Sequence, residues 1–447
     1  MPMASISRWT LAYFGCALAC LVLALGLMGA GIGYPQDGLM APQTLIVVHL
    51  VTIGWLSLLM LGALLQFLPV LVGGSLRWAR LAPPALASLL AGLALLLSGF
   101  AAIDGWPLPP ELLPLGGLLL LLGLSLAAAI LFATLLGART IPLPAGFVAT
   151  ALLSVLVTAL LGETLASAIA GLFGGDFAVA IISHGVALHA GFGLGGWLTF
   201  AAMGVSYRLI SMFLVAPERY GLPARITFFG GALALALLCM GLGVLLATNA
   251  PLSLGLALAG LVGLAAIGAY LGDMVQFYRA RRRRELELHM VAAVAAFVAL
   301  PVGAVLLAVA TAMGSEQGLA AAFHVLALGW LGGLGLAMLY KIVPFLTWLE
   351  CFAPFMGRQP TPRVQDLVRE RPAKTWFILY FTALAMGSAA LLAGMPLAFR
   401  AASLLQLAAV ALLIHEFYRA RLLLDLPEAW HDHQPPRLFL PRQRSFS

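Results

Sequence analysis

Three stretches of this sequence share one frame, and this repetition restricts the possible folds more than any other feature. Aligned without gaps, Trp55, Trp197 and Trp330 each follow a glycine. The other matched positions are Gly62, Gly204 and Ala337; Leu65, Tyr207 and Tyr340; Gln66, Arg208 and Lys341; and Pro69, Ser211 and Pro344. Six residues before the tryptophan, the first and third copies carry a histidine, His49 and His324. Self-similarity at so long a period indicates a repeated architecture.

Composition places these repeats in a membrane. The chain has 447 residues, of which 62% are hydrophobic and only 9% charged, too few to cover the surface of a water-soluble domain. Apolar runs of about 20 residues recur, each long enough to cross the ~30 Å hydrocarbon core as a helix. The positive charges gather in alternate predicted loops, as the positive-inside rule describes. The net charge of +7 therefore indicates topology and no nucleic-acid partner.

The sequence predicts twelve membrane-spanning helices in an all-α polytopic domain, residues 1–425, followed by a basic, Pro-rich cytoplasmic tail, 426–447. The predicted spans are 9–33, 42–73, 81–103, 112–137, 143–172, 177–215, 225–247, 252–278, 288–313, 317–350, 374–396 and 398–421. The repeats occupy the second, sixth and tenth spans, so we expect three pseudo-symmetric four-helix arcs. Loop charge predicts both termini in the cytoplasm of a bacterial-type inner (plasma) membrane, with the first helix retained.

Four histidines inside predicted spans are candidate metal or heme ligands. His49 and His324 each lie about seven residues into a helix, ~10 Å below the outer surface, so they could bind one iron from opposite sides. His184 and His189 lie on the sixth span. They are five residues and so ~140° apart around a helix, which does not suit one shared ion but leaves a second metal or heme site open. The alternative for each of the four is a hydrogen-bonded packing role.

Other polar residues also stand out in the apolar spans. Glu163 is the most isolated acidic residue, and such a carboxyl has either a function or a neutral, hydrogen-bonded structural role. Arg400 is the only Lys or Arg predicted on the outer side, where a heme propionate or a lipid phosphate would be its anionic partner. We interpret Lys341 as snorkelling to the headgroups, His289 as a solvated helix start and Asp273 as an ordinary residue of the cytoplasmic edge.

The third repeat resembles the tenth helix of subunit I in the heme-copper oxidases, most closely the C-type cytochrome c oxidases and the nitric oxide reductases. It reads His-x4-Gly-Trp, with a tyrosine ten and a proline fourteen residues after the tryptophan. The resemblance covers the span count and three helices. It implies one low-spin heme b, with its iron held by His49 on helix two and His324 on helix ten.

The sequence departs from this family at its catalytic centre. Ala322 stands where the family has the histidine of its high-spin heme, and the predicted seventh span, 225–247, contains no histidine for a copper ion. His189 lies two residues out of register with the copper ligand of helix six. We therefore expect no copper, no catalytic residue of the family type, and no reduction of oxygen or nitric oxide by the family mechanism.

The expected function is binding of one b-type heme through two histidines, for electron transfer or for heme or nitric oxide handling. The expected partners are the lipid bilayer, a quinol or cytochrome electron donor and a partner membrane subunit. Two other classes stay open. One is a transporter or channel with Glu163 as its proton or ion site, and the other is an oxidoreductase with a metal site rebuilt around His184 and His189.

Overall fold

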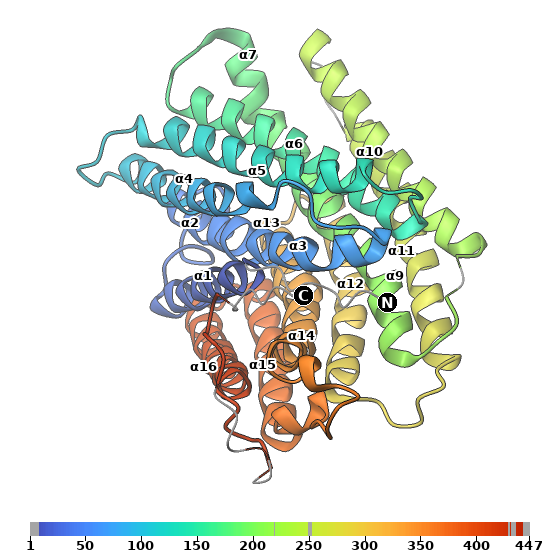
Figure 1. Cartoon of the computed structure of the whole chain (residues 1–447). Coiled ribbons are helices and arrows are strands. Elements are labelled where there is room, and N and C mark those ends of the chain that lie inside the picture. The colour runs from blue at the N-terminus through green and yellow to red at the C-terminus, as the bar shows by residue number, and fades with distance from the viewer. Residues whose placement is uncertain (1–8, 219, 249–252, 428–429, 431–434, 441–447) are drawn as a thin grey trace. The chain divides into compact units, whose positions relative to one another are not determined.

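The computed structural model describes residues 9–218, 220–248, 253–427, 430 and 435–440, and the elements in these ranges are all helices (Figure 1). Within them, twelve helices or helical runs are long and apolar enough to cross a membrane: Thr10–Ala30, Pro42–Val72, Ala79–Ile103, Leu112–Leu136, Leu143–Ile169, Gly175–Leu214, Leu222–Leu245, Leu254–Arg279, Leu288–Met313, Glu316–Cys351, Glu370–Leu392 and Pro396–Arg421. All twelve predicted spans are confirmed, with ends shifted by a few residues. The chain is a multi-pass membrane protein, whereas its three-arc symmetry, inner-membrane location and cytoplasmic termini stay predictions.

Several of these spans are built from consecutive helical segments. In chain order the elements are α1 (Thr10–Ala30), α2 (Pro42–His49), η1 (Leu50–Ser57), α3 (Leu58–Val72), η2 (Ala79–Leu81), α4 (Ala82–Ile103), α5 (Leu112–Leu136), α6 (Leu143–Ile169), α7 (Gly175–Ala180), η3 (Ile181–Gly185), α8 (Val186–Ala190), η4 (Gly191–Thr199), α9 (Phe200–Leu214), α10 (Leu222–Thr248), α11 (Ser253–Arg279), α12 (Leu288–Met313), α13 (Glu316–His324), η5 (Val325–Gly332), α14 (Gly333–Cys351), η6 (Ala353–Phe355), η7 (Val364–Leu367), α15 (Glu370–Leu392) and α16 (Pro396–Arg421).

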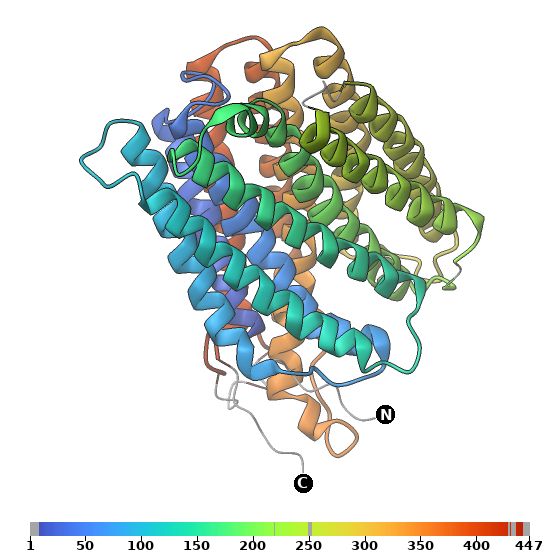
Figure 2. The same ribbon diagram turned by 90° about the horizontal axis from the view of Figure 1, so that it is seen from above.

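The chain forms two compact units. Unit 1 comprises Met1–Leu39, Gly54–Gln66 and Leu286–Ser447, and unit 2 comprises Met40–Ile53 and Phe67–Glu285. In unit 1, α16 packs against both α1 and α15. In unit 2, α4 packs against α5 and α10 packs against α11 (Figure 2). The second span contributes segments to both units.

Small residues let neighbouring helices approach closely, as is usual in membrane proteins. The pair α4 and α5 in unit 2 is an example. A Cβ atom added at Gly99 would lie 2.5 Å from the backbone of Leu113, and one at Gly116 would lie 2.4 Å from the backbone nitrogen of Leu96. Glycine at these positions is therefore what allows the two backbones to touch.

The three repeats widen from α-helical to π-helical geometry at the same register. The π-helical segments η1, η4 and η5 each end two residues after the repeat's tryptophan: Trp55, Trp197 and Trp330. All three indoles are buried. The repetition found in the sequence is thus also a repetition of the backbone, and π-helical segments occur frequently at functional sites.

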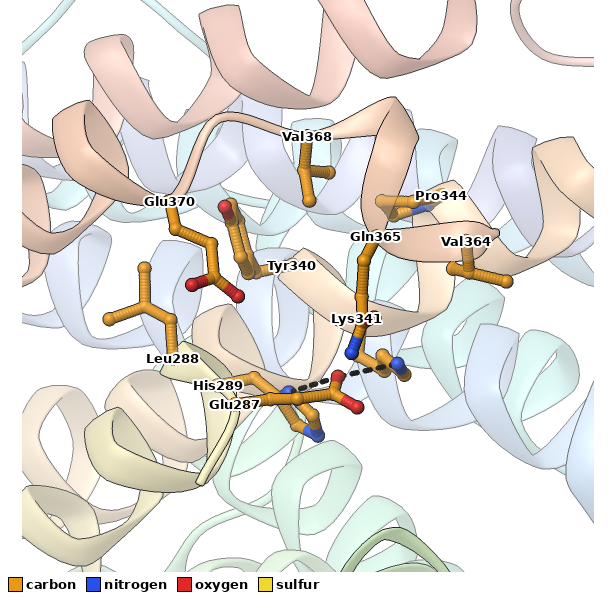
Figure 3. A pocket seen from close by; sticks show the side chains of 10 residues that line it. All are labelled: Glu287, Leu288, His289, Tyr340, Lys341, Pro344, Val364, Gln365, Val368 and Glu370. Atoms are coloured by element: carbon orange, nitrogen blue, oxygen red, sulfur yellow. Dashed lines mark hydrogen bonds and ion pairs between the residues drawn. The ribbon is translucent and has the colours of Figure 1, made fainter. Parts of the chain in front are cut away.

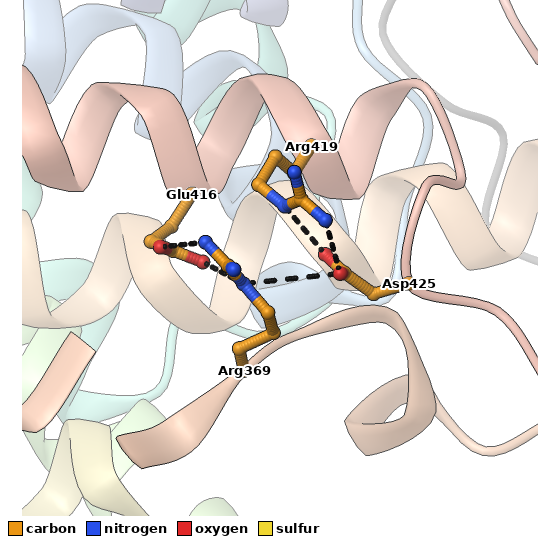
Figure 4. A network of polar contacts seen from close by, with 4 residues as sticks. All are labelled: Arg369, Glu416, Arg419 and Asp425. Carbon is orange, nitrogen blue, oxygen red and sulfur yellow. Dashed lines mark hydrogen bonds and ion pairs between the residues drawn. The ribbon is translucent and has the colours of Figure 1, made fainter. Parts of the chain in front are cut away.

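A network of ion pairs fixes the chain around the end of α16 in unit 1 (Figure 4). Arg369, just before α15, lies 2.6 Å from Glu416, and Arg419 lies 2.7 Å from Asp425. Arg369 also reaches Asp425 at 3.8 Å, which links the two pairs. The side chain of Glu416 is almost fully buried, so this pair holds α15 and α16 together where the apolar spans end.

The predicted tail is described only in part. Trp430 packs its ring against Phe352 with centroids 6.2 Å apart, next to a small apolar cluster of Phe352, Leu367, Leu423 and Leu426. The carbonyl oxygen of Arg437 accepts a hydrogen bond from the buried Arg421. The described part of residues 426–447 therefore packs on unit 1.

Candidate functional site

The histidines His49 and His189 lie side by side in unit 2. Their ring centroids are 6.4 Å apart and their planes are inclined by 36°. His49 is the last residue of α2 and directly precedes the π-helical η1, while His189 lies in α8, two residues before the π-helical η4. The structure thus brings together two of the four predicted ligands, and it does so where the helical geometry changes.

A backbone carbonyl group fixes the orientation of each of these rings. The Nδ1 atom of His49 lies 2.7 Å from the carbonyl oxygen of Leu45, and Nδ1 of His189 lies 3.0 Å from that of Thr158 on α6. Because a carbonyl oxygen only accepts, Nδ1 carries the hydrogen in both rings and Nε2 keeps its lone pair. A ring nitrogen that donates to a backbone carbonyl while the other keeps its lone pair is typical of metal-binding histidines.

One aromatic residue lies next to the ring of His49, and one glycine lies next to the ring of His189. Phe100 on α4 lies beside His49, with ring centroids 5.2 Å apart. Gly162 on α6 lies beside His189, and a Cβ atom there would come within 2.9 Å of the imidazole Cε1. Both histidine residues are half-buried.

His324, the other histidine of the predicted heme pair, belongs to unit 1. Its side chain is buried, its Nε2 atom has no hydrogen-bond partner within the described chain, and its ring lies 5.6 Å from that of Phe399. A Cβ atom at Gly387 on α15 would lie 3.1 Å from Nε2. Glycine at position 387 therefore leaves space beside this nitrogen that a side chain would fill.

The remaining predicted site residues are His184 and Glu163 in unit 2 and Arg400 in unit 1. His184 is half-buried in η3 and has no side-chain contact with His189 among those that the structure describes. Glu163 is on α6 in unit 2, next to Gly162 in the sequence. Arg400 is in unit 1, where its Nε donates a hydrogen bond of 3.2 Å to the carbonyl oxygen of Gly29. Its guanidinium thus has a structural partner at the end of α1.

The spacing of His49 and His189 fits a shared metal ion. An imidazole nitrogen binds a transition metal at about 2 Å, so two rings on opposite sides of one ion have centroids roughly 6 to 6.5 Å apart. The observed 6.4 Å falls in this range. Within the described ranges, no group of three or more His, Cys, Asp or Glu side chains is placed to hold a metal ion. Two imidazoles do complete the coordination of a heme iron, because the porphyrin supplies the other four ligands.

A second polar cluster in unit 1 corrects two interpretations of the sequence (Figure 3). Lys341 does not reach out to the headgroups: its Nζ lies 2.5 Å from Glu287, and its side chain is only 16% exposed. His289 is not solvated but buried, with Nδ1 3.4 Å from the same carboxylate. These residues, with Tyr340 and Glu370, line a cavity of about 10 Å³, which has room for about one water molecule.

Asp273 in α11 is likewise not an ordinary edge residue. It is 5% exposed, and its carboxylate accepts a hydrogen bond of 2.8 Å from the hydroxyl of Tyr207. The same hydroxyl lies 3.3 Å from Oγ1 of Thr227. The sequence signal that could have revealed this pair is the aspartate itself, since a carboxylate inside a predicted span requires a partner.

Comparison with known proteins gives no relative from which a function could be transferred. No family model matches the chain, and no curated protein does.

Proposed function

We propose that this protein binds a b-type heme in the membrane and transfers single electrons, and that His49 and His189 would hold the iron. The observation that carries the proposal is the pair of rings 6.4 Å apart, each oriented through Nδ1 by a backbone carbonyl. A heme with two imidazole ligands supplies one-electron redox chemistry and has no open position for a substrate. The two histidines orient the cofactor and exclude other ligands.

Two residues compete for the place opposite His49. The resemblance to the heme-copper oxidases favours His324, whereas the ring spacing within unit 2 favours His189. Arg400 belongs to the first assignment, because it lies in unit 1 with His324 and would then face a propionate. We choose His189, because its ring lies 6.4 Å from that of His49 in the same unit and is oriented through Nδ1, whereas His324 belongs to unit 1.

The proposal includes a cellular setting, which the loop charges support. A multi-pass protein with its basic loops inside would lie in a bacterial-type inner membrane with both termini in the cytoplasm. There, a quinol or a cytochrome would supply electrons, and a partner membrane subunit could receive them.

The test is a reduced-minus-oxidised absorption spectrum of detergent-purified protein from heme-supplied cells, with a pyridine hemochrome assay for stoichiometry. We expect sharp low-spin b-type bands that disappear in His49→Ala and His189→Ala but persist in His184→Ala and His324→Ala. Exogenous imidazole should restore them in His189→Gly. Bands lost in His49→Ala and His324→Ala but kept in His189→Ala would instead assign the ligand pair of the resemblance. A folded protein without heme would refute the proposal.

The same geometry supports one rival of a different class. A bare copper ion held linearly between two imidazoles requires nearly the same ring spacing, which is an oxidoreductase-type site centred on His189. Metal analysis of the purified protein separates the two. Iron in proportion to heme supports the cytochrome, and stoichiometric copper or zinc without heme supports the rival.

A further inference from the structure

The seventh and eighth spans are covered by protein far less than the other ten. In the most apolar stretches of Leu222–Leu245 and Leu254–Arg279, 11% and 17% of the residues are buried, whereas the other described spans have 33% to 89%. The two spans are formed by α10 and α11, which pack against each other in unit 2. Most of the surface of this helix pair is therefore available to lipid.

One end of this pair carries the densest positive charge in unit 2. Five of the six residues in the arginine segment, 279–284, are arginines, and all five are exposed: Arg279, Arg281, Arg282, Arg283 and Arg284. Arg225, in the first turn of α10, is exposed as well. It lies at the same end, because consecutive spans run antiparallel. The acidic residue nearest in the chain is Glu285, which alone cannot balance so many charges.

The contact that holds one of these arginines does not offset its charge. Nη1 of Arg281 donates a hydrogen bond of 2.7 Å to the carbonyl oxygen of Tyr278, which is a neutral group. A guanidinium group offers several N–H donors in one plane, and these match two oxygens of a phosphate. The arginine segment is therefore suited to phosphate groups.

Large apolar side chains lie one helical turn deeper than the arginines at both helix ends. Val275 is 49% exposed and lies one turn before Arg279 on α11, and Phe229 is 65% exposed and lies one turn after Arg225 on α10. Residues four apart are neighbours on one helix face. A phospholipid has both a phosphate for the arginines and acyl chains for these apolar residues, whereas a free phosphate would use the arginines alone.

We propose that the arginine segment and Arg225 form a binding site for the phosphate groups of anionic phospholipids, at the lipid-facing end of α10 and α11. Clusters of four or more arginines next to a membrane helix attract anionic headgroups. A zwitterionic lipid also has a phosphate, but its own ammonium group cancels the charge. The site therefore discriminates by net charge, and it does not depend on heme.

The first experiment is native mass spectrometry of the full chain in a neutral detergent, with phosphatidylglycerol or phosphatidylcholine added at equal concentration. The wild type should retain phosphatidylglycerol in preference. The double variant Arg282→Gln with Arg284→Gln should bind it about tenfold more weakly, while three arginines of the segment remain. The matched control is Arg80→Gln with Arg139→Gln, which removes two exposed arginines from other loops of unit 2 and should bind like the wild type. Equal binding of the two lipids, or equal losses in the two double variants, would overturn the proposal.

The second experiment uses only the wild type, so it does not depend on the folding of a variant. Phenylglyoxal modifies accessible arginines, and peptide mass spectrometry then gives the extent of reaction at each position. Phosphatidylglycerol should protect Arg281 to Arg284 but not Arg80 or Arg139, and phosphatidylcholine should protect none of them. Equal protection by inorganic phosphate would show a site for soluble anions and overturn the lipid assignment, as would the absence of protection by phosphatidylglycerol.

Discussion

The imidazole rings of His49 and His189 lie next to each other in unit 2, although they come from the second and sixth spans and lie two residues apart in the alignment of the repeats. The centroid spacing of 6.4 Å depends on the two carbonyl groups that hold the rings, those of Leu45 and Thr158. Any change that tilts one ring should therefore weaken metal binding without removing a ligand.

Gly162→Ala provides that change. The new methyl group would lie 2.9 Å from Cε1 of His189, closer than real Cβ contacts, so the ring must tilt or α6 must shift. We expect a loss of heme per protein or broadened b-type bands, and a destabilisation of about 1–3 kcal/mol from overpacking. The pyridine hemochrome assay and thermal unfolding in detergent measure the two effects.

Gly146→Ala is the matched control, because it adds the same methyl group to the same helix at an ordinary distance of 3.5 Å from Phe228. It should leave both the spectrum and the stability close to wild type. Equal heme content in both variants would mean that the ring of His189 is not a ligand.

The sequence was sufficient to predict the spans and the repeats, because both depend on local properties. Hydropathy identifies each helix without reference to its neighbours, and all twelve were found. In all three repeats the Gly-Trp pair that aligns the sequences lies inside the π-helical segment. The π geometry itself was not predictable, since it depends on which backbone hydrogen bonds form around a buried indole, and the residue types leave that open.

The candidate site was predictable in its residues but not in its pairing. Histidines in apolar spans attract attention from sequence alone, whereas the contact of His49 with His189 requires α2, α4, α6 and α8 to pack in a particular way. Lys341 shows the same limit. Its partner Glu287 is 54 residues away in the chain. The position of Lys341 near the end of its own helix therefore predicted snorkelling, because the sequence does not show which distant carboxylate it meets.

Gly117→Ala tests whether the carboxyl of Glu163 really occupies the space beside α5. The added Cβ atom would lie 2.1 Å from Oε2, so we expect a destabilisation of about 1–3 kcal/mol. In a Glu163→Ala background the clash is gone, and the same substitution should cost less, with a coupling free energy of about 0.5–3 kcal/mol. Thermal unfolding of the four proteins of this double-mutant cycle gives the value. Equal costs in the two backgrounds would place the carboxyl elsewhere.

Lys341→Met should destabilise the protein strongly, because it leaves Glu287, whose side chain is only 9% exposed, without its closest cation. Removing one partner of a buried pair typically costs about 3–5 kcal/mol. The double variant Lys341→Met with Glu287→Met should recover part of this loss. Chemical or thermal unfolding in one detergent provides the measurement.

Arg208 gives the control for this prediction, since it is the residue equivalent to Lys341 in the second repeat. It pairs with Glu218, but the two side chains are 37% and 40% exposed. An exposed pair contributes about 0–1 kcal/mol, so Arg208→Met should have little effect. If both methionine variants lose the same stability, burial of the Lys341 pair is not what matters.

Two equivalent tyrosines, ten residues after the tryptophans of their repeats, should respond differently to loss of the hydroxyl group. Tyr207 donates its hydroxyl hydrogen to the buried Asp273, whereas the buried hydroxyl of Tyr340 has no hydrogen-bond partner among the residues described. Tyr207→Phe therefore leaves a buried carboxylate without its donor, at a cost of about 1–3 kcal/mol, while Tyr340→Phe removes no hydrogen bond and should be close to neutral. Adding Asp273→Asn to Tyr207→Phe should reduce the loss, because the uncompensated charge is removed. Thermal unfolding of these variants would contradict the assigned contacts if Tyr340→Phe proved the more damaging of the two single substitutions.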